Sequence, residues 1–101
     1  MLLFIPNVHT FLLVIIIMNE RDKRNEFLCR IYEYVKPDIN QPVEDIHIVA
    51  KTWGFTDHEI QAYAKYWEEK LFIQTKKAFD IGILWVRLTA HGVDYVEDIC
   101  A

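Results

Sequence analysis

Residues 46–63, IHIVAKTWGFTDHEIQAY, predict two helices joined by a tight corner. In the first half of this segment, apolar residues recur at the i, i+3, i+4 and i+7 spacing of a helix with one buried face. These residues are Ile46, Val49, Ala50 and Trp53. Gly54 follows at once, and it is the residue type at which a helix commonly ends and a left-handed backbone costs least. We therefore expect the first helix to end at this glycine.

The second helix has its own start signal. Thr56 and Glu59 form the S/T-x-x-E pattern of a capping box, in which each side chain bonds the backbone amide of the other residue. A new apolar stripe follows, made of Ile60, Tyr63, Ala64, Trp67 and Leu71. Because the stop and start signals are two residues apart, only a sharp turn fits between them. The segment predicts a helix-turn-helix, with an ordinary helical hairpin as the alternative.

Three positions of this corner carry a resemblance. Ala50 is small where two crossed helices would approach, Gly54 tolerates a positive φ at the turn, and Ile60 supplies an apolar anchor on the second helix. At all three positions the segment resembles the helix-turn-helix of DNA-binding regulators.

Composition indicates a single domain in the reducing cytosol. A chain of 101 residues fits one domain, and its net charge of −4 gives no sign of a polyanion-binding protein. Two cysteines, Cys29 and Cys100, are too few for a disulfide framework. We expect each to be a small core hydrophobe rather than a metal ligand or a nucleophile, in a cytoplasmic protein.

Residues 1–17, MLLFIPNVHTFLLVIII, hold 13 apolar residues and no charge, unlike the rest of the chain. Three interpretations stay open. The segment is an upstream extension from a mis-called start, with Met18 as the initiator of a domain at 18–101, or an extra helix packed on the domain or on a second copy. A short membrane anchor is the third and is disfavoured, because polar and helix-breaking residues interrupt the apolar run. These are Pro6, Asn7, His9 and Thr10.

The helix-turn-helix is preceded by a helix over residues 19–36, with Asn19 as its N-cap and Pro37 as its stop. Its expected apolar stripe is Phe27, Leu28, Ile31, Tyr34 and Val35. Residues 37–42 form a connector, after which Val43 is expected to be extended. Glu44 and Asp45 suit the first turn of the next helix.

After the helix-turn-helix, the apolar period changes to that of strands. Residues 72–77 and 83–88 predict a two-stranded hairpin, with a turn at Asp80 and Gly82. Alternation puts Leu84, Val86 and Leu88 on one face of the second strand, and Ile83, Trp85 and Arg87 on the other. Thr89 then caps a last helix through about Ile99, with Val93, Val96 and Ile99 expected to face inward.

This order of elements resembles a winged-helix domain, with the hairpin as its wing. Residues 87–97, RLTAHGVDYVE, resemble the strand, Leu-Thr-x-x-Gly and helix that close many small prokaryotic and phage winged-helix proteins. The resemblance covers residues 19–100 and implies that Gly92 lets the last helix approach closely. The expected fold class is therefore α+β, mainly α: a helix, a helix-turn-helix, a two-stranded wing and a C-terminal helix.

An enzyme is not expected. His47, His58 and His91 lie on three different predicted elements, and no HxxxH, CxxC or paired-carboxylate spacing accompanies them. The chain also lacks serine and every glycine-rich nucleotide-binding pattern. We predict no catalytic residue, metal, cofactor or small-molecule substrate.

The winged-helix resemblance implies a transcriptional regulator that places the second helix of the pair in the major groove of duplex DNA. The expected contacts are Thr56, His58, Gln61, Ala62 and Lys65 on that helix, and Lys76, Lys77 and Arg87 on the wing. Gln61 suits adenine, and Lys65 suits guanine or a phosphate. Residues 56–71 sum to −2, which opposes phosphate contact, whereas residues 72–88 sum to +2.

The rival interpretation is a protein-interaction module or homodimer on the same scaffold. Its evidence is the acidic second helix and an excess of rings, some of which, such as Tyr66 and Trp85, are expected to be exposed. The rings concerned are Trp53, Phe55, Tyr63, Tyr66, Trp67, Phe72, Phe79 and Trp85. The alternative is that they fill the core.

Overall fold

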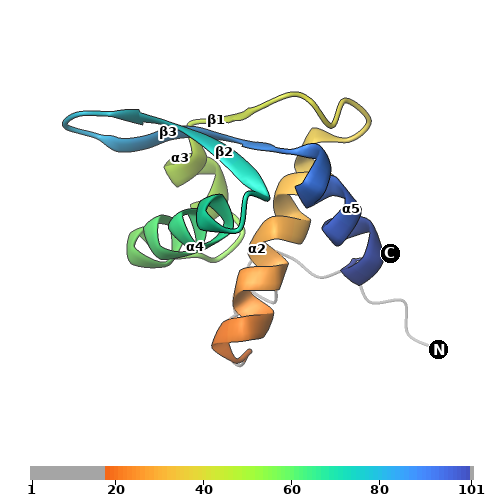
Figure 1. Cartoon of the computed structure of the whole chain (residues 1–101). Helices are drawn as coiled ribbons and strands as arrows, with labels where there is room; N and C mark the ends of the chain where they lie inside the picture. Colours follow the sequence, from red (N-terminus) through yellow and green to blue (C-terminus); the bar gives the residue numbers. More distant parts are fainter. Residues whose placement is uncertain (1–17, 101) are drawn as a thin grey trace.

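The computed structural model describes residues 18–100, in which helices and an antiparallel sheet form an α+β fold (Figure 1). The α+β class is thus confirmed, whereas the interpretations of residues 1–17 lie outside the described residues. Within residues 18–100, no helix is long and apolar enough to cross a membrane. The elements in order are α2 (Glu20–Val35), β1 (Val43–Glu44), α3 (Ile46–Lys51), α4 (Asp57–Glu69), β2 (Ile73–Ala78), β3 (Gly82–Leu88) and α5 (Ala90–Ile99).

One apolar core joins the helices to the inner face of the sheet. Every element contributes to it, and charged side chains are absent from the buried set of the described residues. Its largest fully buried side chains are Phe27, Leu28, Ile31, Val43, Ile46, Ile60, Ile73, Val86 and Val96.

Helix α2 begins as predicted, because the Asn19 side chain accepts a hydrogen bond from the Asp22 amide at 2.8 Å. Four of its five predicted core residues are buried. The prediction for Tyr34 is wrong: this ring is 51% exposed and lies against Trp53, with 5.9 Å between the ring centroids.

The corner between α3 and α4 has the predicted glycine turn and the predicted capping box. Gly54 has a φ of +101°, and both hydrogen bonds of the capping box between Thr56 and Glu59 are present. Helix α3 ends at Lys51 and is shorter than predicted. Ile46 and Ala50 of its predicted stripe are fully buried, whereas Val49 and Trp53 are only half-buried. Helix α4 buries Ile60, Tyr63, Ala64 and Trp67.

Two predictions at the helix ends are wrong. Leu71 is 71% exposed because α4 ends at Glu69 and Leu71 turns the chain with a φ of +67°. Glu44 and Asp45 do not form a first helical turn: Glu44 belongs to β1, and Asp45 precedes α3 with a left-handed φ of +52° and no side-chain cap.

The sheet has three strands in the order β1-β3-β2, one more than the predicted hairpin. Val43 is extended as expected and pairs with Val86, which makes β1 the third strand. A bulge interrupts the pairing of the hairpin, because Lys76 pairs with Trp85 but Lys77 pairs with Ile83. A bulge adds one residue on one strand and so reverses the faces beyond it. For this reason Ile83 is buried, and its predicted place on the face of Trp85 is wrong.

Helix α5 packs closely against the segment before β2. The Thr89 side chain accepts from the Gly92 amide at 3.0 Å, as its predicted capping role requires. A Cβ on Gly92 would lie 2.0 Å from the Phe72 carbonyl oxygen, so only glycine fits this approach. Val93 and Val96 are buried, but Ile99, at the end of the helix, is 40% exposed and its predicted inward position is wrong.

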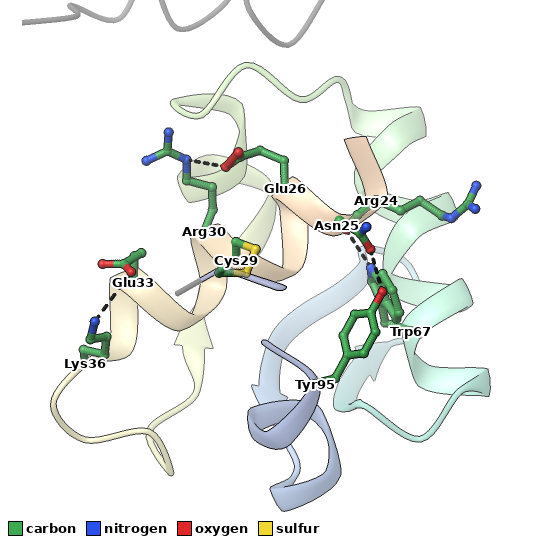
Figure 2. The surroundings of a disulfide bond; sticks show 10 residues. Arg24, Asn25, Glu26, Cys29, Arg30, Glu33, Lys36, Trp67 and Tyr95 are labelled. Carbon is green, nitrogen blue, oxygen red and sulfur yellow. Dashed lines mark hydrogen bonds and ion pairs between the residues drawn. A yellow bond between two sulfur atoms is a disulfide. The ribbon is translucent and has the colours of Figure 1, made fainter. Parts of the chain in front are cut away.

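Cys29 of α2 and Cys100, just after α5, form a disulfide with their Cα atoms 6.0 Å apart (Figure 2). The prediction of two separate core thiols is therefore wrong. The two helices lie side by side, which brings together cysteines 71 residues apart in the chain. The expectation of a reducing cytosol rested on two free thiols, so the pairing removes that support.

Candidate nucleic-acid interface

A groove of about 390 Å³ lies between the outward face of α4 and the β2–β3 hairpin. Five of the eight predicted DNA-contacting residues line it. They are His58, Gln61, Ala62 and Lys65 from α4, and Lys77 from β2. The remaining lining comes from Glu68, Glu69 and Ile83. The fold thus brings most of the predicted site to one open surface.

The other three predicted residues lie elsewhere. The Thr56 hydroxyl accepts from the Glu59 amide at 3.1 Å and so holds the start of α4. Lys76 pairs with Trp85, and the Arg87 guanidinium donates to the Gln74 side-chain carbonyl. Neighbouring strand residues point to opposite faces, so Lys76 and Arg87 lie on the outer face of the hairpin and Lys77 on the groove side. The predicted wing cations do not form one patch.

The acidic residues of α4 are largely paired, with lysines and, in the case of Asp57, also with the His47 ring. Lys51 and His47 each lie 3.0 Å from an oxygen of Asp57, and Lys23 lies 3.1 Å from Glu59. The hydrogen bonds from Lys51 and His47 hold the pKa of Asp57 below its ordinary value. This pairing reduces the repulsion that the helix would exert on a phosphate.

Glu68 is one of the two acidic residues that line the groove. Its carboxylate accepts from the Thr75 hydroxyl and from Lys77 Nζ, the latter at 3.0 Å. The Thr75 hydrogen bond is the main cause that lowers the pKa of Glu68, and Lys77 adds to it. With two lysines and two glutamates on its walls, the groove is formally neutral.

His47 is a site residue that the sequence analysis missed. Its Nε2 lies 3.2 Å from Gln61 Nε2, and its Nδ1 lies 3.0 Å from Asp57 Oδ1. An amide nitrogen only donates, so His47 Nε2 accepts from Gln61, and the Nδ1–H group of His47 donates to Asp57 Oδ1. No local signal marks His47, because Gln61 is 14 residues away and the contact exists only once the two helices cross.

Gln61 is held from two sides. Besides His47, it lies against the backbone of the hairpin, where a Cβ added to Gly82 would come within 2.5 Å of Gln61 Nε2. A second hollow, in front of the corner, is lined by His47, Asp57, His58, Gln61 and Ile81. Gln61 therefore stands where α3, α4 and the hairpin meet.

Most of the eight aromatic rings considered above are buried in the core or packed against it. Phe55, Tyr63 and Trp67 are buried, whereas Phe79 at the hairpin tip is fully exposed. The expectation that Tyr66 and Trp85 are exposed is wrong, because both are half-buried.

Residues 18–100 contain no group of three or more His, Cys, Asp or Glu placed to hold a metal ion. Of the remaining histidines, His91 packs its ring against Phe72, with 5.0 Å between centroids. The absence of an enzyme activity stays a prediction. In comparisons with protein-family models, with curated proteins and with solved structures, no match was found.

Proposed function

We propose that residues 19–100 are a winged-helix domain that binds duplex DNA and regulates transcription. Helix α4 enters the major groove, and the β2–β3 hairpin follows the phosphate backbone as the wing. The order of the elements supports this proposal: a helix, a short strand, two helices joined at a sharp corner, a hairpin and a closing helix. The sheet order β1-β3-β2, with the short strand beside the second wing strand, agrees with it.

The convergence of His58, Gln61, Lys65 and Lys77 on one open groove is the observation that carries the proposal. A recognition helix has to present polar side chains along one exposed face beside the element that grips the backbone. Ala62 is small and exposed in the middle of this face, so it permits close approach to base edges.

Phosphate contact depends on the cations that are not already paired. Among residues 18–100, Lys65 and Lys76 have no ion-pair partner, whereas Lys77 is paired with Glu68 and Lys51 with Asp57. Lys65 projects from α4 and Lys76 from the outer face of the hairpin. We infer that these two lysines make the main phosphate contacts.

Binding of random duplex DNA at different salt concentrations tests this role. Replacing Lys65 and Lys76 together by Ala should weaken binding to all sequences and reduce the slope of log K against log salt by about 1.8, or about 0.9 per contact. Lys36→Ala is the matched control, since Lys36 is an exposed lysine at the end of α2, paired with Glu33 at 3.5 Å. An unchanged slope in the double variant, or no DNA binding at about 50 mM salt, contradicts the proposal.

Sequence preference is expected to depend on Gln61. Gln61→Ala should relax the preference at one base pair by about 1–3 kcal/mol and leave the salt slope nearly unchanged. A selection from randomised duplexes, read for wild type and variant, measures the effect. His47→Ala should have a smaller effect of the same kind, because His47 orients the Gln61 amide.

A second candidate function is protein interaction, including self-association. It is favoured by the neutral groove and by the apolar hairpin tip, where Phe79 is fully exposed and Ile81 is 68% exposed. In that case Phe79→Ser with Ile81→Ser should abolish association in sedimentation experiments, and DNA should not bind at low salt. DNA binding by a monomer that survives the double change would exclude this alternative.

A further inference from the structure

A separate hollow, of about 270 Å³, opens where α2, the end of α4 and α5 meet. It shares no residue with the groove between α4 and the hairpin. Its lining consists of Arg21, Arg24, Asn25, Tyr66, Trp67, Lys70, Phe72 and Tyr95. We call it the basic aromatic pocket.

The charge of this pocket is unusual for the chain. Three cations, Arg21, Arg24 and Lys70, line it without a carboxylate, although the whole protein carries a net charge of −4. Arg21 has an exposed contact with Asp22 at 3.6 Å, but within residues 18–100 neither Arg24 nor Lys70 has an ion-pair partner. An anion entering the pocket would therefore meet uncompensated positive charge.

Arg24 and Lys70 are both held at the ring of Tyr66. The Arg24 Cζ atom lies 4.4 Å and the Lys70 Nζ atom 5.7 Å from the centre of that ring. A ring face attracts a cation without neutralising it, so the guanidinium N–H groups stay available to an oxyanion. The Tyr66 ring thus positions two donors that suit a carboxylate or a phosphate.

The remaining rings are fixed to α2 through their polar atoms. The Tyr95 hydroxyl donates to Asn25 Oδ1 at 3.0 Å, and Trp67 Nε1 donates to the Arg24 carbonyl at 2.9 Å (Figure 2). Phe72 stacks on Trp67, with 5.4 Å between centroids and 16° between the planes, and lies 4.8 Å from the Tyr95 ring. Phe72 and Tyr95 are half-buried, so they present ordered aromatic surface to the hollow.

We propose that the basic aromatic pocket binds a small planar aromatic anion. The ring of the ligand contacts Phe72 and Tyr95, and its carboxylate or phosphate group is bound by Arg24 and Lys70. The volume lies just below the usual range of about 300–1,000 Å³ for small-molecule sites, which favours a ligand of one ring over a dinucleotide. This site goes beyond the proposed DNA-binding function and does not depend on it.

Titration calorimetry with benzoate and phenyl phosphate tests the proposal and distinguishes the two anionic groups. At least one probe should bind at a 1:1 ratio, and the tighter of the two identifies the group preferred. Cyclohexanecarboxylate, which has the charge without the aromatic ring, and benzyl alcohol, which has the ring without the charge, should each bind at least about 10-fold more weakly. No saturable binding of benzoate or phenyl phosphate below about 1 mM overturns the proposal.

Variants assign the binding to this pocket. Arg24→Gln and Lys70→Gln should each weaken the binding of the better probe by about 10-fold or more, since each removes a charged hydrogen bond. Lys70 is exposed, so its replacement tests the pocket even if Arg24→Gln lowers stability. Lys36→Gln, just after α2 and outside the pocket, is the matched control. Equal affinity in all three variants, or equal affinity for cyclohexanecarboxylate, overturns the proposal.

DNA binding should be unchanged by the probe-binding variants, so the two proposals fail independently.

Discussion

Two regions of the molecule are stabilised in different ways (Figure 1). One is the side where α2 packs against α5, and the other is the β2–β3 hairpin. We call them the closed end and the open end. At the closed end, a disulfide joins the two helices and α5 approaches Phe72 so closely that only Gly92 fits. At the open end, the hairpin extends beyond the helices and exposes Phe79 and Ile81 at its tip.

We therefore expect the closed end to determine stability and the open end to determine binding. Changes at the closed end remove long-range constraints and should lower the free energy of unfolding. Changes at the open end touch exposed ion pairs, which contribute little to stability, and should alter binding instead.

The disulfide should have the largest effect on stability. Cys29→Ala opens a loop closed across 71 residues, for which the chain-entropy model gives about 4 kcal/mol. Urea unfolding of wild type with and without reductant, and of the variant, measures this loss. Reduced wild type should have the same free energy of unfolding as the variant. If oxidised wild type is no more stable than the variant, the disulfide does not stabilise the closed end.

Gly92→Ala should follow. The new Cβ would lie 2.0 Å from the Phe72 carbonyl oxygen, and overpacking of this kind costs about 1–3 kcal/mol or more. Thermal unfolding measures the loss, with Asp94→Ala, an exposed change in the same helix, as the control. A variant with the melting temperature of the control would show that α5 can move away freely.

The corner lies between the two ends. Gly54→Val places a β-branched residue at a φ of +101° and should cost about 1–2 kcal/mol, because such residues resist positive φ. Gly54→Asn should cost less, since asparagine tolerates this region better. If the two variants lose the same free energy of unfolding in chemical denaturation, the loss is not caused by the positive φ of residue 54.

Acid should weaken the contact between α2 and α4. Burial raises the pKa of Glu59, but the Thr56 amide and Lys23 outweigh it, so the net shift is below the ordinary value of 4.5. A depressed folded pKa gives stability that is present above 4.5 and is lost as the pH falls through the folded value. Glu59→Gln should therefore flatten the stability profile in this acidic range. If the stability of Glu59→Gln falls as steeply with decreasing pH as that of wild type, other carboxyl groups cause the acid sensitivity.

Glu68→Gln should have the smallest effect on stability and a clear effect on binding. Loss of its exposed ion pair with Lys77 should change the free energy of unfolding by less than about 1 kcal/mol. The groove then loses one negative charge and its formal charge becomes +1, so DNA affinity should rise, with a salt slope steeper by about 0.9 if Lys77 reaches a phosphate. Glu33→Gln, which frees Lys36 at the C-cap of α2, should leave DNA binding unchanged. Equal affinity of Glu68→Gln and wild type would argue against phosphate contact at the open end.

Local features of this protein could be predicted from neighbouring residues in the chain. Asn19, Thr56 and Thr89 cap their helices as predicted, and Gly54 turns the corner. Each of these signals acts within about one helical turn, so the residues that decide the outcome are neighbours in the chain. The same holds for the outward face of α4, whose helical period places His58, Gln61, Ala62 and Lys65 on one surface.

Contacts between distant residues could not be predicted, because they depend on how the elements pack in the folded chain. Spacing could not show that Cys29 bonds to Cys100, that Val43 adds a third strand, or that His47 bonds to Gln61. The bulge beyond Lys76 turned Ile83 into the core against the strict alternation that the sequence suggests. These outcomes depend on how the helices pack against the sheet, because the contacts that stabilise them do not exist until the chain has folded.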